Sequence, residues 1–280
     1  MKKISRRSFL AASGLTIVAL ALTACGGSAS TASSAASSVA ASSEAASTSA
    51  AAAELTTVEA GKLTMATNAA FPPYEMTTDA GAFEGIDIDT AQAIADKLGL
   101  ELQIDYMDFD AALLSVQQGK ADIAMAGVTV TDERKNVMDF SDSYATGIQS
   151  IIVPEGSDIA SPDDLAGKMI GTQRGTTGYI YCSDDFGDDA VVAYDDGLTA
   201  VQALNNGQVD AVVIDNAPAK EFVAANPGLV LLETSYAEED YAIGMAKGNT
   251  ALEDAVNAAL EELKADGTLQ SIVDKYITAE

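Results

Sequence analysis

Histidine and tryptophan are absent from the 280 residues, and cysteine occurs only at positions 25 and 182. Without histidine, the chain lacks the commonest general base and the commonest zinc ligand of proteins. We therefore expect no metal site, no cofactor and no enzymatic activity. We expect Cys25 to lie outside the folded part of the chain, so Cys182 has no cysteine with which to form an intramolecular disulfide, and no histidine can activate it. We expect Cys182 to be a packed side chain.

Basic residues are scarce: 15 stand against 42 acidic residues, for a formal net charge of −27. This balance excludes the basic footprint of a nucleic-acid-binding protein, and it excludes a basic patch for anionic lipids. Four of the basic residues lie within the first seven positions. Beyond the leader only two arginines remain, Arg134 and Arg174, and all other cations are lysines.

The N-terminus is basic and is followed by an apolar run over residues 9–22. That run is short for a membrane span and is typical of the hydrophobic region of a signal peptide. The sequence Leu-Thr-Ala-Cys at 22–25 resembles the lipobox of bacterial lipoproteins. The resemblance implies that residues 1–24 are removed, that Cys25 is lipidated, and that the protein is anchored at the outer face of the cell membrane, or on the periplasmic side in a Gram-negative bacterium. Residues 5–10, SRRSFL, also resemble a twin-arginine export motif, so the export route stays open.

Residues 26–53 consist almost entirely of serine, alanine, threonine and glycine. Such a segment cannot bury enough apolar surface to offset its backbone entropy. We therefore expect residues 25–54 to form a lipidated, disordered tether with a reach on the order of 30 Å. The folded part should begin near residue 55.

Strand and helix patterns alternate from residue 62 onward. We expect strands at 62–67, 100–106 and 122–126, and helices at 88–98 and 112–118. Asp89 is the expected N-cap of the first helix, and Gly99 is its expected end. This βαβα order predicts an α/β fold in which helices flank sheets rich in parallel strands.

Two stretches of the chain resemble each other at an offset of 88 residues. Residues 115–126 read SVQQGKADIAMA and residues 203–214 read ALNNGQVDAVVI, with a glycine and an aspartate aligned. Both predict a short helix, a glycine and an apolar strand, which favours two related lobes. Residues 238–246 predict a segment that returns to the first lobe, because the two helices that follow need a sheet to cover. The first of these helices has an apolar stripe over 252–263, and the second is expected to be capped by Thr268. We therefore expect one lobe of 55–147 plus 243–280 and a second of 148–242, joined by two crossovers that form a hinge.

Arg134 and Asp215 follow predicted strands, one in each half of the chain. In open parallel sheets, ligands bind beyond the carboxyl ends of the strands. If the lobes face each other, a guanidinium and a carboxylate meet, and this pair is complementary to a zwitterion. Arg134 would then hold an α-carboxylate, aided by a helix N-terminus and Thr129, and Asp215 would hold an α-ammonium. The simpler alternative is that Arg134 pairs with Asp132 or Glu133 at the surface.

A second polar turn, QRGTTG at 173–178, follows a strand expected at 169–171. It offers backbone N–H groups and two hydroxyls that could hold a carboxylate, but it lacks the spacing of a phosphate-binding P-loop. Phe71, in the stretch FPPY, and Phe109 follow two further predicted strands. Aromatic residues at such places are usually core residues, but here they could stack on a ligand at the same edge.

Long stretches of the body are similar to family 3 extracellular solute-binding proteins, which serve ABC importers of polar amino acids. They are TNAAFPPYE (67–75), GIDIDTAQAIADKLG (85–99), MDFDAALLSVQQGKADIAMAGVTVTDERK (107–135), DFSD (139–142), LAGKMIGTQRGTTG (165–178), GQVDAVVIDN (207–216) and ADGTLQSIVDKY (265–276). The resemblance implies the two-lobe, type II periplasmic-binding fold. Thr90 departs from the family signature, which has an aliphatic residue there, and this affects only local packing.

The resemblance implies a monomer that binds a free amino acid between its lobes and delivers it to an ABC permease. Arg134 would clamp the α-carboxylate, Asp215 the α-amino group, and Phe71 and Phe109 would sandwich the side chain. The expected ligand-binding set is Asn68, Phe71, Phe109, Ala126, Gly127, Thr129, Arg134, Gln173, Thr176, Thr177 and Asp215.

The ligand side chain stays open, and we favour a polar or basic L-amino acid. Asn68, Gln173 and Ile214 stand where the family tunes selectivity. Glutamine binders tend to have an acid at the first of these positions and a histidine at the last. Residues 207–227 resemble the arginine- and lysine-binding branch, yet Asn68 is neutral where an acid would help a cation.

Two other classes remain open. One is a secreted dehydratase acting on prephenate or arogenate, which needs an acid in the cleft for which the sequence offers no convincing candidate. Asp215 would also be a poor neighbour for a dicarboxylate. The other is a signalling sensor, which would be fused to a membrane span and a signalling domain, and we do not expect such a fusion here.

Overall fold

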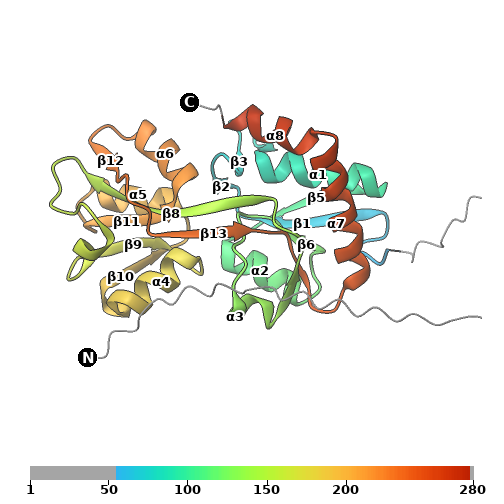
Figure 1. Cartoon of the computed structure of the whole chain (residues 1–280), viewed down its shortest axis with the longest axis horizontal. Helices are drawn as coiled ribbons and strands as arrows, with labels where there is room; N and C mark the ends of the chain where they lie inside the picture. Colours follow the sequence, from blue (N-terminus) through green and yellow to red (C-terminus); the bar gives the residue numbers. More distant parts are fainter. Residues whose placement is uncertain (1–54, 278–280) are drawn as a thin grey trace, which may run out of the picture. The chain divides into compact units, whose positions relative to one another are not determined.

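The computed structural model describes residues 55–277, all within one compact unit. The predicted signal peptide, Cys25 and nearly all of the tether lie outside the described residues. Within the described part, the strands form two large sheets and one small sheet, and helices lie on both sides of the large sheets (Figure 1). The small sheet is antiparallel and consists of β2 (Ala70–Phe71), β3 (Glu75–Thr77) and β4 (Phe83–Glu84).

The first large sheet has the order β5-β1-β6-β14-β7. Its strands are β5 (Glu101–Tyr106), β1 (Lys62–Thr67), β6 (Ile123–Ala124), β14 (Gly244–Ala246) and β7 (Met138–Phe140). β1 runs parallel to β5 and β6, and β14 runs antiparallel to β6 and β7. The sheet is therefore parallel among β5, β1 and β6. It is antiparallel around β14, the strand that the chain adds after it has completed the second sheet.

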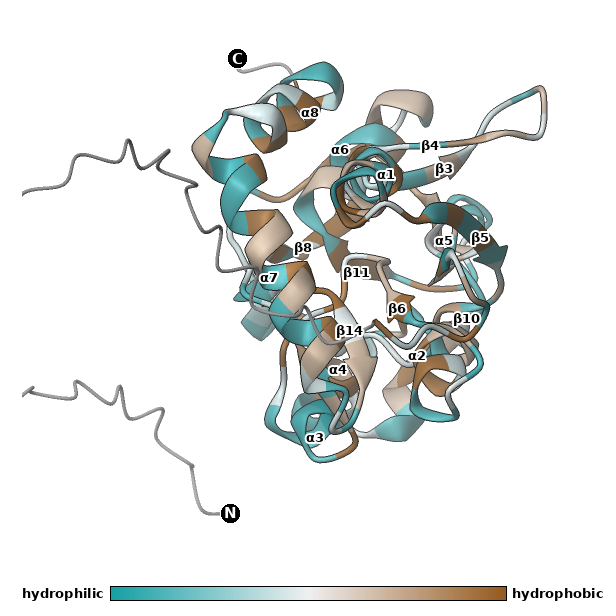
Figure 2. Cartoon of the chain, turned by 90° about the vertical axis from the view of Figure 1, so that its right-hand side faces the viewer, coloured by the Kyte–Doolittle hydropathy of each residue, from teal (hydrophilic) through white to brown (hydrophobic). Residues whose placement is uncertain are grey.

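Helices cover both faces of this sheet because successive strand residues point to opposite sides. Met65 of β1 packs in one apolar cluster with Ile94 and Leu260, whereas the next residue, Ala66, packs with Val116. Each large apolar side chain buried in this way contributes about 1.5–3 kcal/mol. The covering helices are α1 (Ile86–Leu98), α7 (Thr250–Ala265) and α8 (Thr268–Tyr276) on one face and α2 (Phe109–Gln117) on the other. Figure 2 shows α7 alternating between hydrophilic and hydrophobic colours along its length, as a half-buried helix should.

The second large sheet has the order β10-β9-β11-β8-β12, with β13 also paired to β8. Its strands are β10 (Val191–Tyr194), β9 (Ile170–Gln173), β11 (Ala211–Asp215), β8 (Ala145–Pro154), β12 (Leu229–Leu231) and β13 (Ala237–Tyr241). The first three are mutually parallel, and β8 is antiparallel to β11, β12 and β13. The flanking helices are α4 (Thr177–Phe186), α5 (Gly197–Asn205) and α6 (Asn216–Ala225), with two 3-10 turns, η1 (Pro162–Leu165) and η2 (Asp188–Ala190).

The chain passes between the two large sheets twice, once through β8 and once between β13 and β14. β8 and β13 pair antiparallel from Ala145 opposite Tyr241 to Gln149 opposite Ala237, so the two crossovers lie side by side (Figure 1). The second sheet is built entirely from residues 145–241, and the first uses residues on both sides of that segment. The lobe boundaries expected from the sequence stay a prediction.

The two similar stretches of sequence form the same local structure. In each, a helix ends, a glycine adopts a left-handed conformation (φ 64° at Gly119 and 66° at Gly207), and a strand beside a parallel neighbour follows. The aligned aspartates also share a role. Asp122 accepts a hydrogen bond of 2.7 Å from the backbone N–H of Thr64, and Asp210 accepts one of 2.7 Å from that of Met169. Each carboxylate, just before its own strand, is therefore hydrogen-bonded to the backbone of the parallel neighbouring strand or of the residue that precedes it.

The starts of three helices differ from the sequence prediction. Two helices begin earlier in the chain, and the third has a different N-cap residue. α1 begins at Ile86 with Gly85 as N-cap, not at Asp89, because Gly85 has φ 134° and ψ 174°, a conformation almost restricted to glycine. α2 begins at Phe109, three residues before the predicted start. Thr268 is the first residue of α8 rather than its cap, since Gly267 takes the cap position.

Gly85 fixes the junction between the small sheet and α1, so its replacement should be costly. A Cβ atom there would lie 2.1 Å from the carbonyl oxygen of Tyr74, in addition to the unfavourable φ. We expect Gly85→Ala to lower the free energy of unfolding by about 3 kcal/mol or more, measured by urea denaturation. Gly81→Ala is the matched control, because Gly81 also has a positive φ (79°) but has no atom within 4 Å of the added Cβ. It should cost only about 1 kcal/mol, and equal costs for the two variants would contradict this account of Gly85.

Candidate functional site

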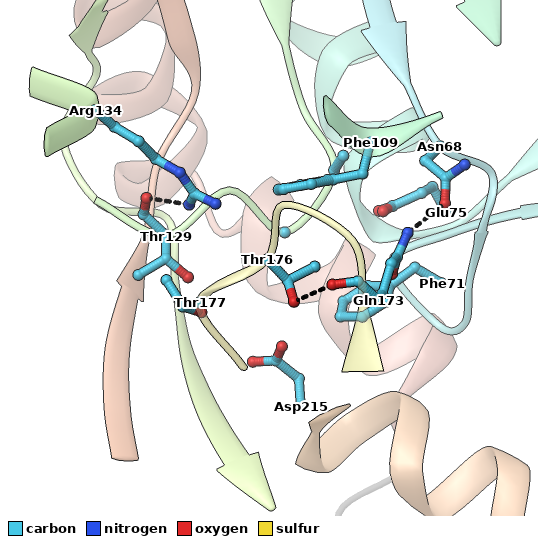
Figure 3. Close-up of a pocket in the computed structure, with 12 residues that line it drawn as sticks. Asn68, Phe71, Glu75, Phe109, Thr129, Arg134, Gln173, Thr176, Thr177 and Asp215 are labelled. Carbon is cyan, nitrogen blue, oxygen red and sulfur yellow. Dashed lines mark hydrogen bonds between the residues drawn. The ribbon is translucent and has the colours of Figure 1, made fainter. Parts of the chain in front are cut away.

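The eleven residues predicted to bind a ligand line one pocket between the two large sheets, together with Glu75 (Figure 3). They come from the ends of strands β1, β6, β9 and β11, from the small sheet, from the starts of helices α2 and α4, and from the loop after β6 with the short helix α3 (Asp132–Lys135) that follows it. The carboxyl ends of parallel strands therefore meet across this pocket, as the open-sheet rule predicts. The pocket volume is about 10 Å³, close to that of one water position, so the two halves are closed over it.

Arg134 is a buried cation at the pocket wall and does not pair with Asp132 or Glu133 at the surface. It lies on α3 (Asp132–Lys135), a short helix whose N-cap, Thr131, accepts a hydrogen bond from the Arg134 N–H. Its side chain donates to the carbonyl of Thr129 at 2.7 Å and, across the pocket, to that of Gly175 at 3.1 Å. The guanidinium has five N–H groups, so three remain for other acceptors.

Burial lowers the pKa of Arg134, and the negative charge of Glu239 opposes that shift most strongly. The guanidinium also lies over the ring of Phe109, with 5.4 Å between its central carbon and the ring centroid. Arginine remains charged under these conditions. The arrangement therefore places a fixed positive charge, with free donors, on one wall of the pocket.

The N-terminus of α4 directly follows Gly175, the residue that Arg134 contacts across the pocket. Thr176 is its N-cap and accepts a hydrogen bond of 3.3 Å from the backbone of Tyr179, and Thr177 is its first residue. The first N–H groups of a helix have no partner within the helix and carry partial positive charge. Together with Arg134, this helix end can bind a carboxylate.

Asp215 lies at the end of β11 and is 7% exposed. One carboxyl oxygen accepts a hydrogen bond of 2.8 Å from the side-chain amide of Gln149. Burial raises the pKa of Asp215 to about 7, with a smaller raising effect from Glu239, while the hydroxyl of Tyr241 opposes the shift. A cation bound here would favour the ionised carboxylate, so the site can accept an ammonium group.

The other polar groups of the pocket contact each other across the two sheets. The side-chain amide of Gln173 donates to that of Asn68 at 3.0 Å (Figure 3). Asn68 in turn donates to the backbone carbonyl of Met107 at 3.0 Å. Phe71 and Phe109 are 6% and 5% exposed and contribute the apolar walls. This end of the pocket therefore offers two aromatic rings and a pair of amides.

The sequence interpretation missed two acids of this region, Glu75 and Glu239. Glu239, on β13, accepts hydrogen bonds on one oxygen from the hydroxyls of Thr129 (3.1 Å) and Thr177 (2.9 Å) and from Gln149 (3.0 Å). Both threonine hydroxyls, which the sequence assigned to a ligand carboxylate, are thus donors to the protein's own carboxylate in this structure. A bound carboxylate would depend on Arg134 and backbone N–H groups unless these hydroxyls change partners.

Asp87 orients the backbone at Gly127, another pocket residue. It accepts hydrogen bonds from the Gly127 N–H at 3.0 Å and from the hydroxyl of Tyr144 at 2.9 Å. Burial raises the pKa of Asp87 to about 6 even though both hydrogen bonds lower it. Gly127 has φ 55°, and a Cβ there would lie 3.0 Å from the ring of Phe71, so a glycine fits this wall best.

Cys182 is fully buried among apolar residues of the second sheet, as expected for a packed side chain. Burial raises the pKa of its thiol to about 12. Within residues 55–277 no group of three or more metal-ligating side chains is found. No helix in that part of the chain has the length and apolarity needed to cross a membrane.

Two α/β halves joined by two adjacent strands, with a buried cation and a buried acid on a closed pocket between them, define a two-lobed binding protein. Residues 63–279 match the bacterial extracellular solute-binding proteins of family 3, and the chain belongs to this family. The family predicted from the sequence is thus confirmed. The fold is that of the type II periplasmic amino-acid-binding proteins, with helices flanking sheets that contain parallel strands.

Individual relatives are similar over most of their length. A probable histidine-binding protein of Neisseria gonorrhoeae is 33% identical over 278 residues, covering 96% of this chain and 95% of the relative. The solved structure of an ancestral arginine-binding protein bound to glutamine is 41% identical with a TM-score of 0.75, covering 79% of this chain and 100% of that one. The arginine-, lysine-, histidine-binding protein ArtJ from Geobacillus stearothermophilus is 34% identical with a TM-score of 0.75, covering 78% and 96%.

Proposed function

We propose that the protein is the extracytoplasmic substrate-binding component of an ABC importer and captures a polar or basic L-amino acid between its lobes. The observation that carries this proposal is the pairing of Arg134 and Asp215 on the walls of one buried pocket. Each is a charged group with unused hydrogen-bonding capacity in a place where an unpaired charge is costly. An α-amino acid carries the two complementary charges on adjacent groups.

In this proposal Arg134 and the N-terminus of α4 bind the α-carboxylate, and Asp215 binds the α-ammonium. Asn68, Phe71, Phe109 and Gln173 surround the ligand side chain. The lobes open and close about the crossovers β8 and β13, and the closed pocket supports this because an amino acid needs more room to enter than about 10 Å³. Binding energy then shifts the equilibrium toward the closed state, which a permease would recognise.

Several named relatives bind arginine, histidine, cystine or glutamine, which supports an amino-acid ligand without choosing among them.

A lipid on Cys25 and a tether over 25–54 would hold the folded part near the permease in the same membrane. The anchor is tested by labelling cells with a palmitate analogue. The parent protein should be labelled and membrane-bound, and Cys25→Ser should be unlabelled; equal labelling would refute lipidation at this cysteine.

The proposed function is tested by thermal unfolding of the full chain in the presence of each of the twenty L-amino acids, cystine and prephenate. A ligand that binds only the native state stabilises it by about 4 kcal/mol at 1,000 times its Kd. We expect a clear upward shift in Tm with one or a few amino acids. No shift with any amino acid would contradict the proposal, and a shift with prephenate alone would favour the dehydratase alternative.

A further inference from the structure

Glu239 is a buried acid beside the pocket, on the second crossover strand. It is 7% exposed, whereas Glu238 and Asp240 on either side of it are exposed, because alternate residues of β13 face inward. Two residues further on, Tyr241 forms a β-bridge with Thr129, which lies in the loop after β6. Glu239 therefore stands where the chain leaves the second large sheet and approaches the first.

One carboxyl oxygen of Glu239 accepts hydrogen bonds from both halves of the molecule. The hydroxyl of Thr129, in the half built on the first sheet, donates at 3.1 Å, and that of Thr177, at the start of α4 in the other half, donates at 2.9 Å. Figure 3 shows these two threonine side chains close together. The side-chain amide of Gln149, on the crossover strand β8, donates to the same oxygen at 3.0 Å. A single carboxylate thus joins both halves to both crossovers.

The electrostatic effects around Glu239 extend into both halves. Burial, then the charge of Glu239 and a hydrogen bond to it, raise the pKa of the Tyr181 hydroxyl on α4, which therefore stays protonated at neutral pH. On the other side, the charge of Glu239 is the largest effect that opposes the lowering of the Arg134 pKa by burial. Buried carboxylates are tolerated where several donors hydrogen-bond to them.

The same hydrogen bonds support the two residues proposed to bind the ligand backbone. The carbonyl of Thr129 accepts a hydrogen bond of 2.7 Å from Arg134, and the amide of Gln149 also donates to Asp215 at 2.8 Å. Glu239 therefore reaches each member of the clamp through one intervening residue. It can influence ligand affinity without contacting the ligand.

The bonds to Glu239 differ from those that cross between the halves inside the pocket. Arg134 donates to the carbonyl of Gly175, and Gln173 donates to Asn68, so these bonds use groups that the proposed ligand would contact. The bonds to Glu239 join groups of the protein alone. They stabilise the closed arrangement whether or not a ligand is bound.

We propose that Glu239 is a positioning residue that latches the two lobes together, its carboxylate joining Thr129 of one lobe to Thr177 of the other. Opening about β8 and β13 separates the two hydroxyls, so one carboxylate cannot keep both bonds. This inference deepens the proposed function and rests on it, since it assumes that the lobes open and close around an amino acid. Without the latch the closed state is rarer, and a ligand that needs the closed state binds more weakly by the same factor.

The latch is tested first without ligand, through the distance between two spin labels measured by pulsed electron spin resonance. Lys120→Cys and Asp188→Cys place labels at exposed positions, one in each lobe and each just before a parallel strand. Cys182 is fully buried and should stay unlabelled, and Cys25→Ser removes the other native cysteine. We expect the closed distance in about a tenth or more of the parent molecules. Glu239→Gln should lower the ratio of closed to open molecules at least about fivefold.

Two further variants show whether the effect belongs to the latch. Glu238→Gln removes the adjacent, exposed acid and is the matched control, so it should leave the distance distribution unchanged. Thr177→Val removes one of the joined hydroxyls and should shift the population in the same direction as Glu239→Gln. The double variant should open little further, because both substitutions act on one bond. Full additivity would show that Glu239 acts elsewhere and would overturn the latch.

The consequence for binding is measured by calorimetric titration of Glu239→Gln with the amino acid that gives the largest shift in Tm. Affinity should fall about fivefold, in step with the closed population, and mainly through faster dissociation. Tighter binding would mean that Glu239 competes with the ligand for the threonine hydroxyls, and it would overturn the proposal. An unchanged Tm without ligand would show that Glu239→Gln has not damaged the fold.

The outcomes separate the latch from the proposed function. If Glu239→Gln leaves the distances unchanged, or if Glu238→Gln shifts them equally, the latch is wrong, and the amino-acid clamp stands as long as the parent protein binds its ligand. A parent protein without any closed molecules in the absence of ligand would also overturn the latch. If the distances respond to Glu239→Gln but no amino acid binds, the proposed function fails while the link between the lobes remains.

Discussion

Arg134→Ala is expected to weaken amino-acid binding by at least about 100-fold, because truncating one partner of a buried, hydrogen-bonded charge pair costs 2–5 kcal/mol or more. The ligand carboxylate would then be buried opposite an alanine, with only the N-terminus of α4 to compensate. Arg134→Lys should have a smaller but clear effect, about tenfold, since lysine keeps the charge and loses the planar fork of donors. The measurement is calorimetric titration with the amino acid that gives the largest shift in Tm.

Arg174→Ala is the matched control for this prediction. Arg174 is the other arginine of the described chain, its side chain is 51% exposed, and its ion pair with Asp195 spans 3.5 Å at the surface. Such a pair contributes about 0–1 kcal/mol, so ligand affinity should stay within about twofold of the parent. If Arg174→Ala and Arg134→Ala weakened binding equally, or if Arg134→Ala left it intact, the assignment of the α-carboxylate to Arg134 would be wrong.

Asp215→Asn is expected to weaken amino-acid binding about as much as Arg134→Ala does, by at least about 100-fold. The reason is that the variant cannot neutralise a buried α-ammonium. The same substitution should stabilise the ligand-free protein at alkaline pH. The folded-state pKa of Asp215 is about 7, above the value of about 3.9 for an unfolded chain. The carboxyl group therefore favours the folded state most below about pH 4, and that contribution is lost as the pH rises through 7.

The parent protein should consequently lose stability relative to Asp215→Asn between about pH 4 and 7, and the variant should be more stable by about 2 kcal/mol at pH 8. Urea denaturation of both proteins over that pH range, without ligand, measures this difference. Asp195→Asn is the control: its side chain is 72% exposed, so it should change neither affinity nor the pH profile. A parallel pH dependence of Asp215→Asn and the parent would show that Asp215 does not titrate as described.

The sequence was sufficient to predict which strand ends meet at the pocket. Arg134, Asp215 and the turn containing Thr176 each follow an apolar strand, and the open-sheet rule brings such positions to one edge. The eleven-residue set that the family resemblance implies also lines this pocket. Whether each residue contacts a ligand stays a prediction.

The two missed acids could not be found in this way, because their positions follow from tertiary packing. Glu75 stands in a short strand of a three-stranded sheet that has no periodic pattern, and Glu239 stands among three consecutive acids, a composition typical of an exposed segment. The pairing of β13 with β8 turns Glu239 inward, while Glu238 and Asp240 on either side of it remain exposed. Alternation along a strand would have been the signal, had the strand been recognised.

Helix starts were missed for a related reason. The apolar periodicity that marks α1 and α2 gives their buried face but not their first turn. Gly85 caps α1 without a side-chain hydrogen bond, and Asp87 in the first turn points inward to Gly127 and Tyr144 instead of remaining at the surface. A local rule for caps cannot foresee a carboxylate recruited by a residue forty positions away.

The central claim is that the pocket recognises a zwitterion through one buried cation and one buried acid. The most direct measurement is calorimetric titration of the full chain with the best-binding L-amino acid, its α-carboxamide and its Nα-acetyl derivative. The account predicts that the free amino acid binds and that each derivative binds at least about 100-fold more weakly, because each leaves one buried charge of the protein unpaired. Equal binding of either derivative would contradict the claim for the residue that faces the altered group.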